Sequence, residues 1–310
     1  MRAVTLDSVP ATPAVTEIDA PRPAAGEVLV EVAASSVNGF DVAVAAGHVR
    51  ELMEHRFPLV LGKDFAGTVA EVGEGVTGID VGDRVFGVVM TPVLQAGTMA
   101  QYAAVPAAYG LVRVPEGLSL ADAGALGLAG TAALNSLDAA KVSEGDTVLI
   151  SGATGGVGAY AVQLAAARGA HVIATARPGE EADFVTGLTD APVRVVDHTG
   201  DLEAGVRELA PAGVDVVLHL AGDATRLAGL LCTDGRLAST LGLPADAVPG
   251  TTLHPVLADP NAETLTTLAE LAAKGALRVP VTTVYPLDQA PEAFTAFRKG
   301  TLGKIAVSCS

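Results

Sequence analysis

The segment SGATGGVGAYAVQLA, residues 151–165, sets four glycines between two apolar stretches and restricts the fold more than any other part of the chain. The preceding TVLI is typical of a buried strand, and AYAVQLA is typical of a helix. Glycine at a strand-to-helix turn lets the backbone adopt positive φ and approach a ligand closely. Because the amino end of a helix offers unpaired N–H groups and a positive dipole end, this turn predicts a site for a dinucleotide pyrophosphate.

The glycines follow the spacing GxxGxxG, a variant of the dinucleotide fingerprint. A phosphate loop for nucleoside triphosphates would need Gly-Lys-Ser/Thr at the start of the helix, and Val157-Gly158-Ala159 contains no lysine. The remaining alternative is a turn that only permits close packing of the helix on the sheet. We predict cofactor contacts for the turn residues Gly152, Thr154, Gly155, Gly156, Val157 and Gly158.

Two different patterns divide the chain. Up to about residue 118 it is rich in short β-type runs such as EVLVEVAA and GTVAEVG, separated by glycine and proline turns. From Ser119 a long alanine-rich helix is predicted, with Ser119 and Asp122 in capping positions, and apolar strands then alternate with helices. This alternation predicts a doubly wound parallel sheet covered on both faces, and therefore an α/β fold.

Charge and hydropathy exclude several classes of partner. The chain has 19 Lys and Arg against 35 Asp and Glu, a formal net charge of -16, so a nucleic acid would meet a repulsive surface. The start MRAVTLDSVPATP lacks a basic segment followed by an apolar core, and no run of about 18 uninterrupted apolar residues occurs elsewhere. We expect a cytoplasmic protein without a membrane or nucleic-acid partner.

The end of the strand after the glycine turn, HVIATARPG, bears on the choice of cofactor. NAD requires an Asp or Glu there for the ribose 2′-hydroxyl, whereas this chain has Ala176 followed by Arg177. A guanidinium without a competing carboxylate suits the 2′-phosphate of NADPH. The alternative for Arg177 is a solvated loop residue, and the nearby Glu180 and Glu181 weaken the local positive field. We predict NADPH as the cofactor.

Five segments resemble the medium-chain dehydrogenase/reductase superfamily, specifically its zinc-independent quinone oxidoreductase branch. They are SSVNGFDVAVAAG, PLVLGKDFAGTVAEVGEGV, ALGLAGTAALNSL, VLISGATGGVGAYAVQLA and GTLGKIAVS. The resemblance implies a GroES-like partial β-barrel formed by both chain ends, with an inserted Rossmann domain and an active site in the cleft between them. The expected limits are 1–120 for the first part of the GroES-like catalytic domain, 121–260 for the Rossmann NADP-binding domain and 261–310 for the rest of the catalytic domain.

The resemblance also bears on zinc. Zinc-dependent relatives have a cysteine where this chain has Asn38, and a His-Glu pair where it has Lys63-Asp64. An amide and an ammonium cannot replace thiolate and imidazole around Zn²⁺. Cys232 and Cys309 lie too far apart in sequence for a cysteine-rich zinc lobe. We therefore predict no metal and a hydride transfer from NADPH to a quinone or to the β-carbon of an enone.

The same mapping implies several site residues. Asn38 would lie near the nicotinamide, Lys63 would polarise the acceptor carbonyl or supply a proton, and Thr131 would lie beside the nicotinamide ring. Their alternatives are a loop-capping asparagine, an ion pair of Lys63 with Asp64 or Asp41, and a hydroxyl satisfied by its own helix. Further cofactor contacts are implied for His198, near the adenosine phosphate, and for Ala221, Gly222, Leu241, Gly242 and Lys304.

The sequence says less about the hydride acceptor and about the oligomeric state. Val42 and Val44 stand where many quinone reductases have a hydrogen-bonding aromatic residue, so an enone gains ground over a quinone. One alternative is a dedicated enoyl or alkenal reductase of a biosynthetic pathway, and another is a non-catalytic NADPH-binding sensor or structural protein. RLASTLG followed by TTLHPVLAD predicts an apolar strand near the edge of the Rossmann sheet, so we expect a homodimer.

Overall fold

The computed structural model describes all residues from 1 to 310, which form two compact units. Unit 1 comprises Met1–Leu128 and Pro260–Ser310, and unit 2 comprises Ala129–Asp259. Helix α2 (Leu120–Ala139) contains the first boundary, and its cap forms as expected because the Asp122 N–H donates to Ser119 Oγ. The domain limits expected from the sequence, 1–120, 121–260 and 261–310, stay a prediction.

Unit 1 is built on a seven-stranded sheet with the order β10-β7-β6-β3-β18-β17, to which β9 adds by pairing with β3. The strands and helices before α2 are β1 (Arg2–Leu6), β2 (Ala14–Glu17), β3 (Glu27–Ser36), α1 (Gly39–Ala45), β4 (Glu54–His55), β5 (Leu59–Val60), β6 (Asp64–Val72), β7 (Arg84–Val88), β8 (Val93–Leu94), β9 (Tyr102–Pro106) and β10 (Leu111–Arg113). Those near the end of the chain are α7 (Ala262–Ala273), β17 (Val281–Pro286), the 3₁₀ turn η1 (Leu287–Gln289), α8 (Ala290–Arg298) and β18 (Lys304–Ser308).

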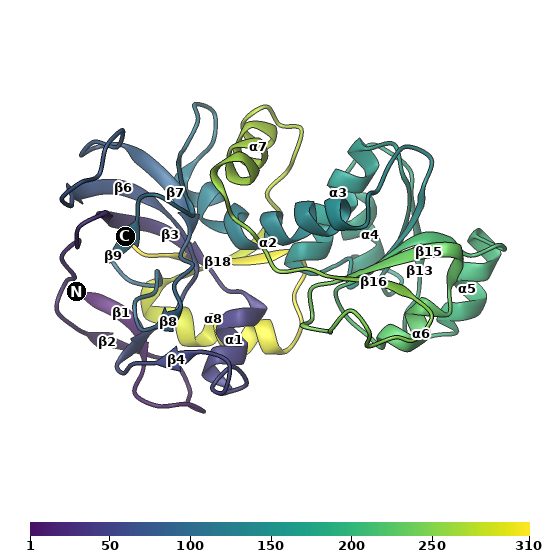
Figure 1. Cartoon of the computed structure of the whole chain (residues 1–310), viewed down its shortest axis with the longest axis horizontal. Helices are drawn as coiled ribbons and strands as arrows, with labels where there is room; N and C mark the ends of the chain where they lie inside the picture. Colours follow the sequence, from purple (N-terminus) through teal and green to yellow (C-terminus); the bar gives the residue numbers. More distant parts are fainter. The chain divides into compact units, whose positions relative to one another are not determined.

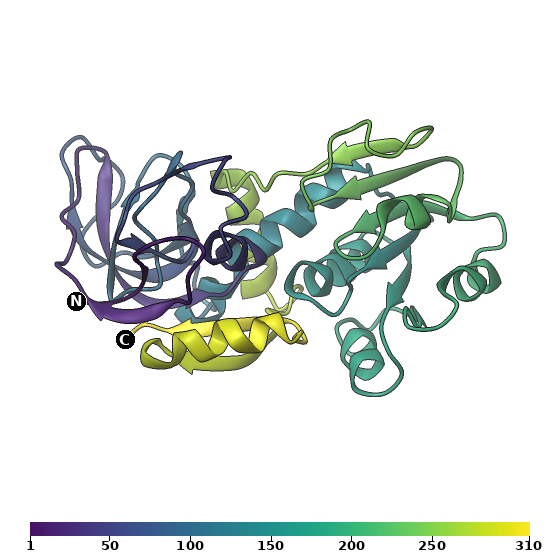
Figure 2. The same cartoon turned by 90° about the horizontal axis from the view of Figure 1, so that it is seen from below.

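The first part of the chain and its last strand meet in this sheet, whereas β1 lies in a separate three-stranded sheet with the order β2-β1-β5. Strand β18 pairs antiparallel with β3, with Ala306 opposite Ser36, and the two strands lie side by side in Figure 1. The start of β18 therefore lies next to the residues that follow β3. Helix α8 covers β17 and β18, as Figure 2 shows in yellow.

Alternation explains β3, because Val28, Val30 and Val32 are buried in the apolar core of unit 1. Helix α1 was not among the predicted elements. Its seven residues, GFDVAVA, are too few to show a helical period clearly, and the Asp41 carboxylate accepting from the Asn38 N–H at 2.9 Å marks its start.

Unit 2 contains a six-stranded parallel sheet with the order β13-β12-β11-β14-β15-β16, which confirms the predicted doubly wound α/β fold. Its elements are β11 (Thr147–Ser151), α3 (Gly156–Ala167), β12 (His171–Thr175), α4 (Glu180–Thr186), β13 (Val193–Val196), α5 (Leu202–Leu209), β14 (Val214–His219), α6 (Ala224–Ala228), β15 (Leu231–Ser239) and β16 (Thr252–Pro255). Figure 1 shows these helices flanking the sheet.

The strand order reverses between β11 and β14. From β11 the chain adds β12 and β13 on one side, and it then crosses to add β14, β15 and β16 on the other. Such a reversal opens a crevice at the carboxyl ends of the strands. Helix α6 ends at Ala228, and β15 begins at Leu231.

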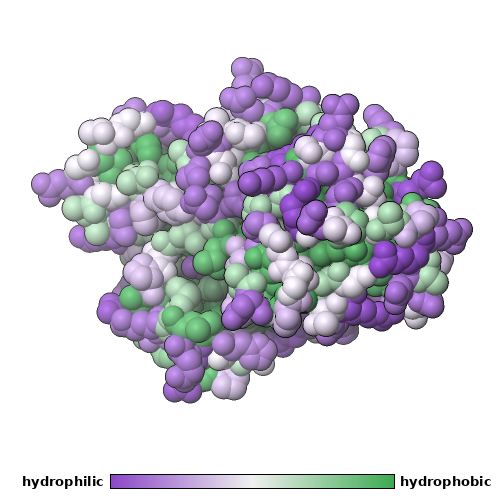
Figure 3. Space-filling model, turned by 45° about the vertical axis from the view of Figure 1, so that its right-hand side comes forward, coloured by the Kyte–Doolittle hydropathy of each residue, from purple (hydrophilic) through white to green (hydrophobic).

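Hydrophilic residues are distributed over the surface, as the dispersed acidic residues of the sequence suggest. Figure 3 shows hydrophilic residues spread over the face in view, with smaller groups of apolar residues between them. None of the helices combines the length and the apolar character that a membrane span needs.

Candidate functional site

A cavity of about 290 Å³ opens in unit 2 at the carboxyl ends of β11, β12 and β14. Five predicted contacts meet here, and residues not predicted as contacts also line the cavity. The predicted ones are Gly152, Thr154, His198, Ala221 and Gly222; the others are Ser151, Thr175, Leu202, Asp223, Arg226 and Leu227. We call this cavity the crevice.

Backbone geometry shows which positions of the turn require glycine. Gly152 has φ +87°, which favours glycine, and a Cβ on Gly158 would lie 2.2 Å from the Gly152 carbonyl oxygen. A Cβ on Gly155 would meet nothing nearer than 3.6 Å. Thr175 Oγ1 also accepts from the Gly152 N–H at 3.0 Å. Gly158 is thus required for packing, whereas Gly155 leaves open space.

Helix α3 begins at Gly156 with Gly155 as N-cap, and no side chain caps its first N–H groups. These donors and the open space at Gly155 fit a pyrophosphate, so the crevice suits a dinucleotide.

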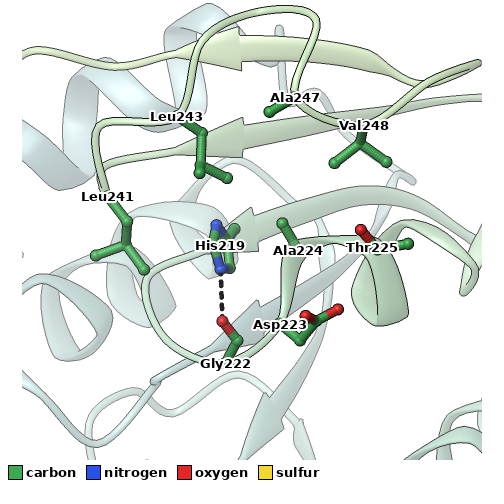
Figure 4. Close-up of a pocket in the computed structure, with 9 residues that line it drawn as sticks. All are labelled: His219, Gly222, Asp223, Ala224, Thr225, Leu241, Leu243, Ala247 and Val248. Atoms are coloured by element: carbon green, nitrogen blue, oxygen red, sulfur yellow. Dashed lines mark hydrogen bonds between the residues drawn. The ribbon is translucent and has the colours of Figure 1, made fainter.

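A second cavity of about 360 Å³ lies next to the crevice and shares Gly222 and Asp223 with it. Figure 4 shows Leu241, Leu243, Ala247 and Val248 on the loop after β15, facing Ala224 and Thr225 of α6. The predicted residue Leu241 thus lines this cavity, and Gly242, with φ +71°, turns the chain beside it.

His219, at the floor of the second cavity, is a structural residue. Its Nε2 lies 3.0 Å from the Gly222 carbonyl oxygen and its Nδ1 lies 2.9 Å from Ser239 Oγ, so both ring nitrogens already have partners.

Thr131 supplies a polar atom without a partner. Its Oγ1 is buried in unit 2 and makes no hydrogen bond, whereas the hydroxyl of Ser136 on the same helix donates to the Ala132 carbonyl oxygen at 2.7 Å. The alternative that the helix satisfies the Thr131 hydroxyl is therefore wrong. A buried hydroxyl without a partner costs free energy unless a ligand pairs with it, so Thr131 fits the predicted cofactor.

In unit 1, charged and polar side chains gather in what we call the charge cluster: Ser36, Asn38, Asp41, Lys63, Asp64 and Lys304. All six are buried. The Lys304 ammonium donates to Asn38 Oδ1 at 2.6 Å and to the Val37 carbonyl oxygen at 3.3 Å, and it lies 3.5 Å from Asp64 Oδ2. Its three hydrogens are thus directed at oxygens of unit 1, and the contact of Lys304 with the cofactor stays a prediction.

Asn38 and Asp64 complete the centre of the charge cluster. Asn38 Nδ2 donates to Asp64 Oδ2 at 2.8 Å and to the Ser36 carbonyl oxygen at 3.3 Å. Asp64 also accepts from Ser36 Oγ and, through Oδ1, from the Leu128 N–H at 2.6 Å. Both amide hydrogens of Asn38 thus have acceptors within the protein, and a contact of Asn38 with the nicotinamide or the acceptor carbonyl stays a prediction. The amide positions Asp64 and Lys304.

Lys63 differs from the rest of the charge cluster. Its side chain is buried with 7% of the residue exposed, yet the ammonium has no hydrogen-bond acceptor and lies 5.0 Å from the centre of the Phe40 ring. The expected alternative of an ion pair with Asp64 or Asp41 is wrong, since Asp64 pairs with Lys304 and no carboxylate lies within 4.0 Å of Lys63 Nζ. Burial lowers the pKa of Lys63, while the negative charge of Asp41 opposes that shift.

Asp41 was not a predicted site residue. Burial raises the pKa of its carboxyl to about 6, although the hydrogen bond from the Asn38 N–H acts in the opposite direction. The Asn-x-x-Asp spacing of residues 38–41, typical of a helix start, is the signal that could have identified it. Ser36 carries no such signal.

The residues do not fit a zinc ion. No group of three or more His, Cys, Asp or Glu side chains comes together in the structure, and the Asp64 carboxylate is already bound by Ser36, Asn38, Leu128 and Lys304.

Val42 and Val44 were expected to make the acceptor pocket more apolar. Val44 belongs to the apolar core of unit 1, and the partly buried Val42 packs against that core.

Two family models match the chain. Residues 24–116 match the alcohol dehydrogenase GroES-like domain, and residues 192–307 match a zinc-binding dehydrogenase domain. The chain is 37% identical over 296 residues to a mycocerosic acid synthase-like polyketide synthase of Mycobacterium tuberculosis, which covers 87% of this chain but only 13% of that relative. It is 29% identical to a chloroplast envelope quinone oxidoreductase homolog of Arabidopsis thaliana, covering 94% of this chain and 92% of the relative.

Solved structures agree over the full length. The quinone oxidoreductase from Coxiella burnetii has a TM-score of 0.89 at 26% identity, covering 100% of this chain and 99% of that one. A mycobacterial protein complexed with NADPH has a TM-score of 0.86 at 28% identity, covering 99% of both chains. An alcohol dehydrogenase superfamily protein from Novosphingobium aromaticivorans has a TM-score of 0.86 at 30% identity, covering 100% of both. The chain belongs to the medium-chain dehydrogenase/reductase superfamily of oxidoreductases, in its quinone oxidoreductase branch.

Proposed function

We propose that this protein is an NADPH-dependent, zinc-independent reductase that transfers hydride to a quinone or an α,β-unsaturated carbonyl. The observation that carries the proposal is the crevice of unit 2, beside which the uncapped start of α3 and the open space at Gly155 offer a dinucleotide the N–H donors it needs. The buried Thr131 hydroxyl, which has no hydrogen-bond partner, supports the proposal separately. The mycobacterial neighbour complexed with NADPH supports the choice of cofactor.

The chemistry would divide between cofactor and protein. Bound NADPH supplies the hydride, and the chain must stabilise the negative charge that develops on the acceptor oxygen. The Lys63 ammonium suits that task because its side chain is largely buried and none of its hydrogens has an acceptor in the protein. Its lowered pKa would also make it a readier proton donor. Asn38, Asp64 and Lys304 would act as positioning residues.

Zinc independence is supported by the donor set. Asn38, Lys63 and Asp64 stand in the two segments where zinc-dependent relatives keep their ligands, and Asp64 is held in an ion pair with Lys304. Polarisation of the carbonyl would then fall to an ammonium rather than to a metal.

A homodimer would use the edge of the Rossmann sheet. Strand β16 is the outermost strand, and Leu257, just after it, is 86% exposed. Pairing with a second copy would cover the free backbone groups of that edge. Size-exclusion chromatography with light scattering tests whether the protein is a dimer. The cytoplasmic location stays a prediction.

One rival is favoured by a specific observation. The relative with 37% identity is a polyketide synthase, which supports a dedicated enoyl reductase. A screen of NADPH oxidation over 1,4-benzoquinone, a naphthoquinone, 2-alkenals, cyclic enones and an enoyl thioester separates the two. High rates with quinones support the broad reductase, and a strong preference for the thioester supports the enoyl reductase. NADPH binding without turnover of any acceptor supports a sensor or structural protein instead.

A further inference from the structure

The residue expected to bind the 2′-phosphate is already held by a carboxylate. Glu181 Oε2 accepts from the Arg177 backbone N–H at 2.7 Å, and Glu181 Oε1 accepts from Arg177 Nε at 2.8 Å and from Nη2 at 2.5 Å. Two guanidinium N–H groups of Arg177 therefore share one oxygen of the Glu181 carboxylate, and the other oxygen binds the Arg177 backbone. Donating this hydrogen bond to Glu181 raises the pKa of the Arg177 guanidinium, and accepting it lowers the pKa of the Glu181 carboxyl.

This pair lies beside the crevice, next to the residue expected near the adenosine phosphate, His198. His198 lines the crevice, and its Nε2 is 3.8 Å from Glu181 Oε2. Arg177 follows β12 by two residues, where the family of dinucleotide folds reads the ribose. The Arg177 side chain is 62% exposed and that of Glu181 is 16% exposed. The guanidinium can thus be reached by a ligand, while the carboxylate is fixed behind it.

The local charge does not favour a phosphate. The negative charge of Asp197 also acts on Arg177, so the guanidinium faces two carboxylates, Glu181 and Asp197. A phosphate monoester brings about two further negative charges near neutral pH. It would have to share or displace Glu181 at the guanidinium. A ribose 2′-hydroxyl carries no charge and can donate to a carboxylate, so it meets no such competition.

We infer that Glu181 is a specificity-determining residue that competes with the 2′-phosphate for Arg177, so that the protein discriminates only weakly between NADPH and NADH. This inference rests on the proposed function. It assigns the discrimination to the charge of Glu181, whereas the sequence argument relied on Arg177 and on the absence of a carboxylate at Ala176.

The test compares Glu181→Gln with the matched control Glu180→Gln, whose side chain is exposed in the same turn. Gln keeps an oxygen that can accept from the Arg177 N–H, so only the charge is removed. Isothermal titration of the full chain with 2′,5′-ADP and with 5′-ADP measures the two ribose states directly. NADPH and NADH oxidation under a saturating acceptor gives the ratio of kcat/KM values.

We expect E181Q to bind 2′,5′-ADP about tenfold more tightly than wild type, to change 5′-ADP affinity by less than about twofold, and to raise the NADPH/NADH ratio of kcat/KM in proportion. E180Q should change none of these values. Unchanged or weaker binding of 2′,5′-ADP by E181Q, in a protein whose wild type binds both fragments, overturns the inference and leaves the proposed function standing. If wild type binds neither fragment and neither dinucleotide, both fall together.

Discussion

The two units build their candidate sites from different material. In unit 2 the crevice is shaped by glycine backbone, and its specificity comes from where a Cβ is absent. In unit 1 the charge cluster is made of buried side chains that bind one another, and only the Lys63 ammonium lacks an acceptor. The comparison teaches that the glycine turn of a binding site can be contiguous in sequence, whereas a buried polar cluster depends on partners that are distant in sequence.

The largest effect should come from breaking the buried ion pair of unit 1. Lys304→Met leaves the Asp64 carboxylate buried without its cation, so we expect the free energy of unfolding to fall by about 3–5 kcal/mol. Urea denaturation followed by circular dichroism measures the loss. Lys299→Met, at an exposed position near the end of α8, is the control. A loss below about 1 kcal/mol would show that the charge cluster is solvated.

A methyl group at Gly158 should damage unit 2 through packing. Gly158→Ala places a Cβ 2.2 Å from the Gly152 carbonyl oxygen, so the turn must shift, at a cost of about 3 kcal/mol in unfolding free energy. Gly155→Ala has room for its Cβ and should keep its stability, yet lose NADPH affinity because the methyl group narrows the approach to the α3 start. Thermal melts and NADPH fluorescence separate the two effects. Equal stability losses would contradict this difference.

Lys63→Met tests whether the unpartnered ammonium of unit 1 does chemistry. We expect kcat to fall about 30-fold, roughly 2 kcal/mol of transition-state stabilisation, with little change in NADPH affinity. Because burial lowers the pKa of Lys63, the wild-type rate should decline with rising pH below the ordinary lysine value of 10.5, as the ammonium loses its proton. That alkaline limb should be absent from the variant. Near-normal kcat in Lys63→Met would leave the residue a structural role.

The smallest effect concerns the unpartnered hydroxyl of unit 2. Thr131→Val removes a buried group without a hydrogen bond, so stability should stay within about 1 kcal/mol of wild type or rise. Ser136→Ala, whose hydroxyl donates to the Ala132 carbonyl oxygen, should lose about 1 kcal/mol. If Thr131 contacts the cofactor, the Kd for NADPH should increase about fivefold only in Thr131→Val. An unchanged Kd would remove Thr131 from the site.

The family resemblance supplied the cavity-lining residue Gly222, whereas the sequence pattern itself predicted the parallel sheet, the helix beginning near Gly156 and the cavity-lining residues Gly152 and Thr154. It did so because strand, turn and helix follow one another within about 20 residues, where periodicity and glycine conformation are local properties. Helix α1 was missed because seven residues are too few to show a helical period. The ion pair of Arg177 with Glu181 was not predicted, since an ion pair produces no periodic pattern; the sequence indicated only that Glu180 and Glu181 weaken the positive field at Arg177.

The tertiary structure decided the charge cluster. Lys304 was assigned to the cofactor and Lys63 to an ion pair as its alternative, yet the antiparallel register of β18 against β3 carries Lys304 to Asn38 and Asp64 and leaves Lys63 without an acceptor. No local pattern encodes which of two lysines pairs with Asp64, because residues 64 and 304 become neighbours only when the first part of the chain and its last strand enter one sheet. What the sequence by itself determined is therefore the glycine crevice, while the buried charges depend on distant strands being brought together and removed from water.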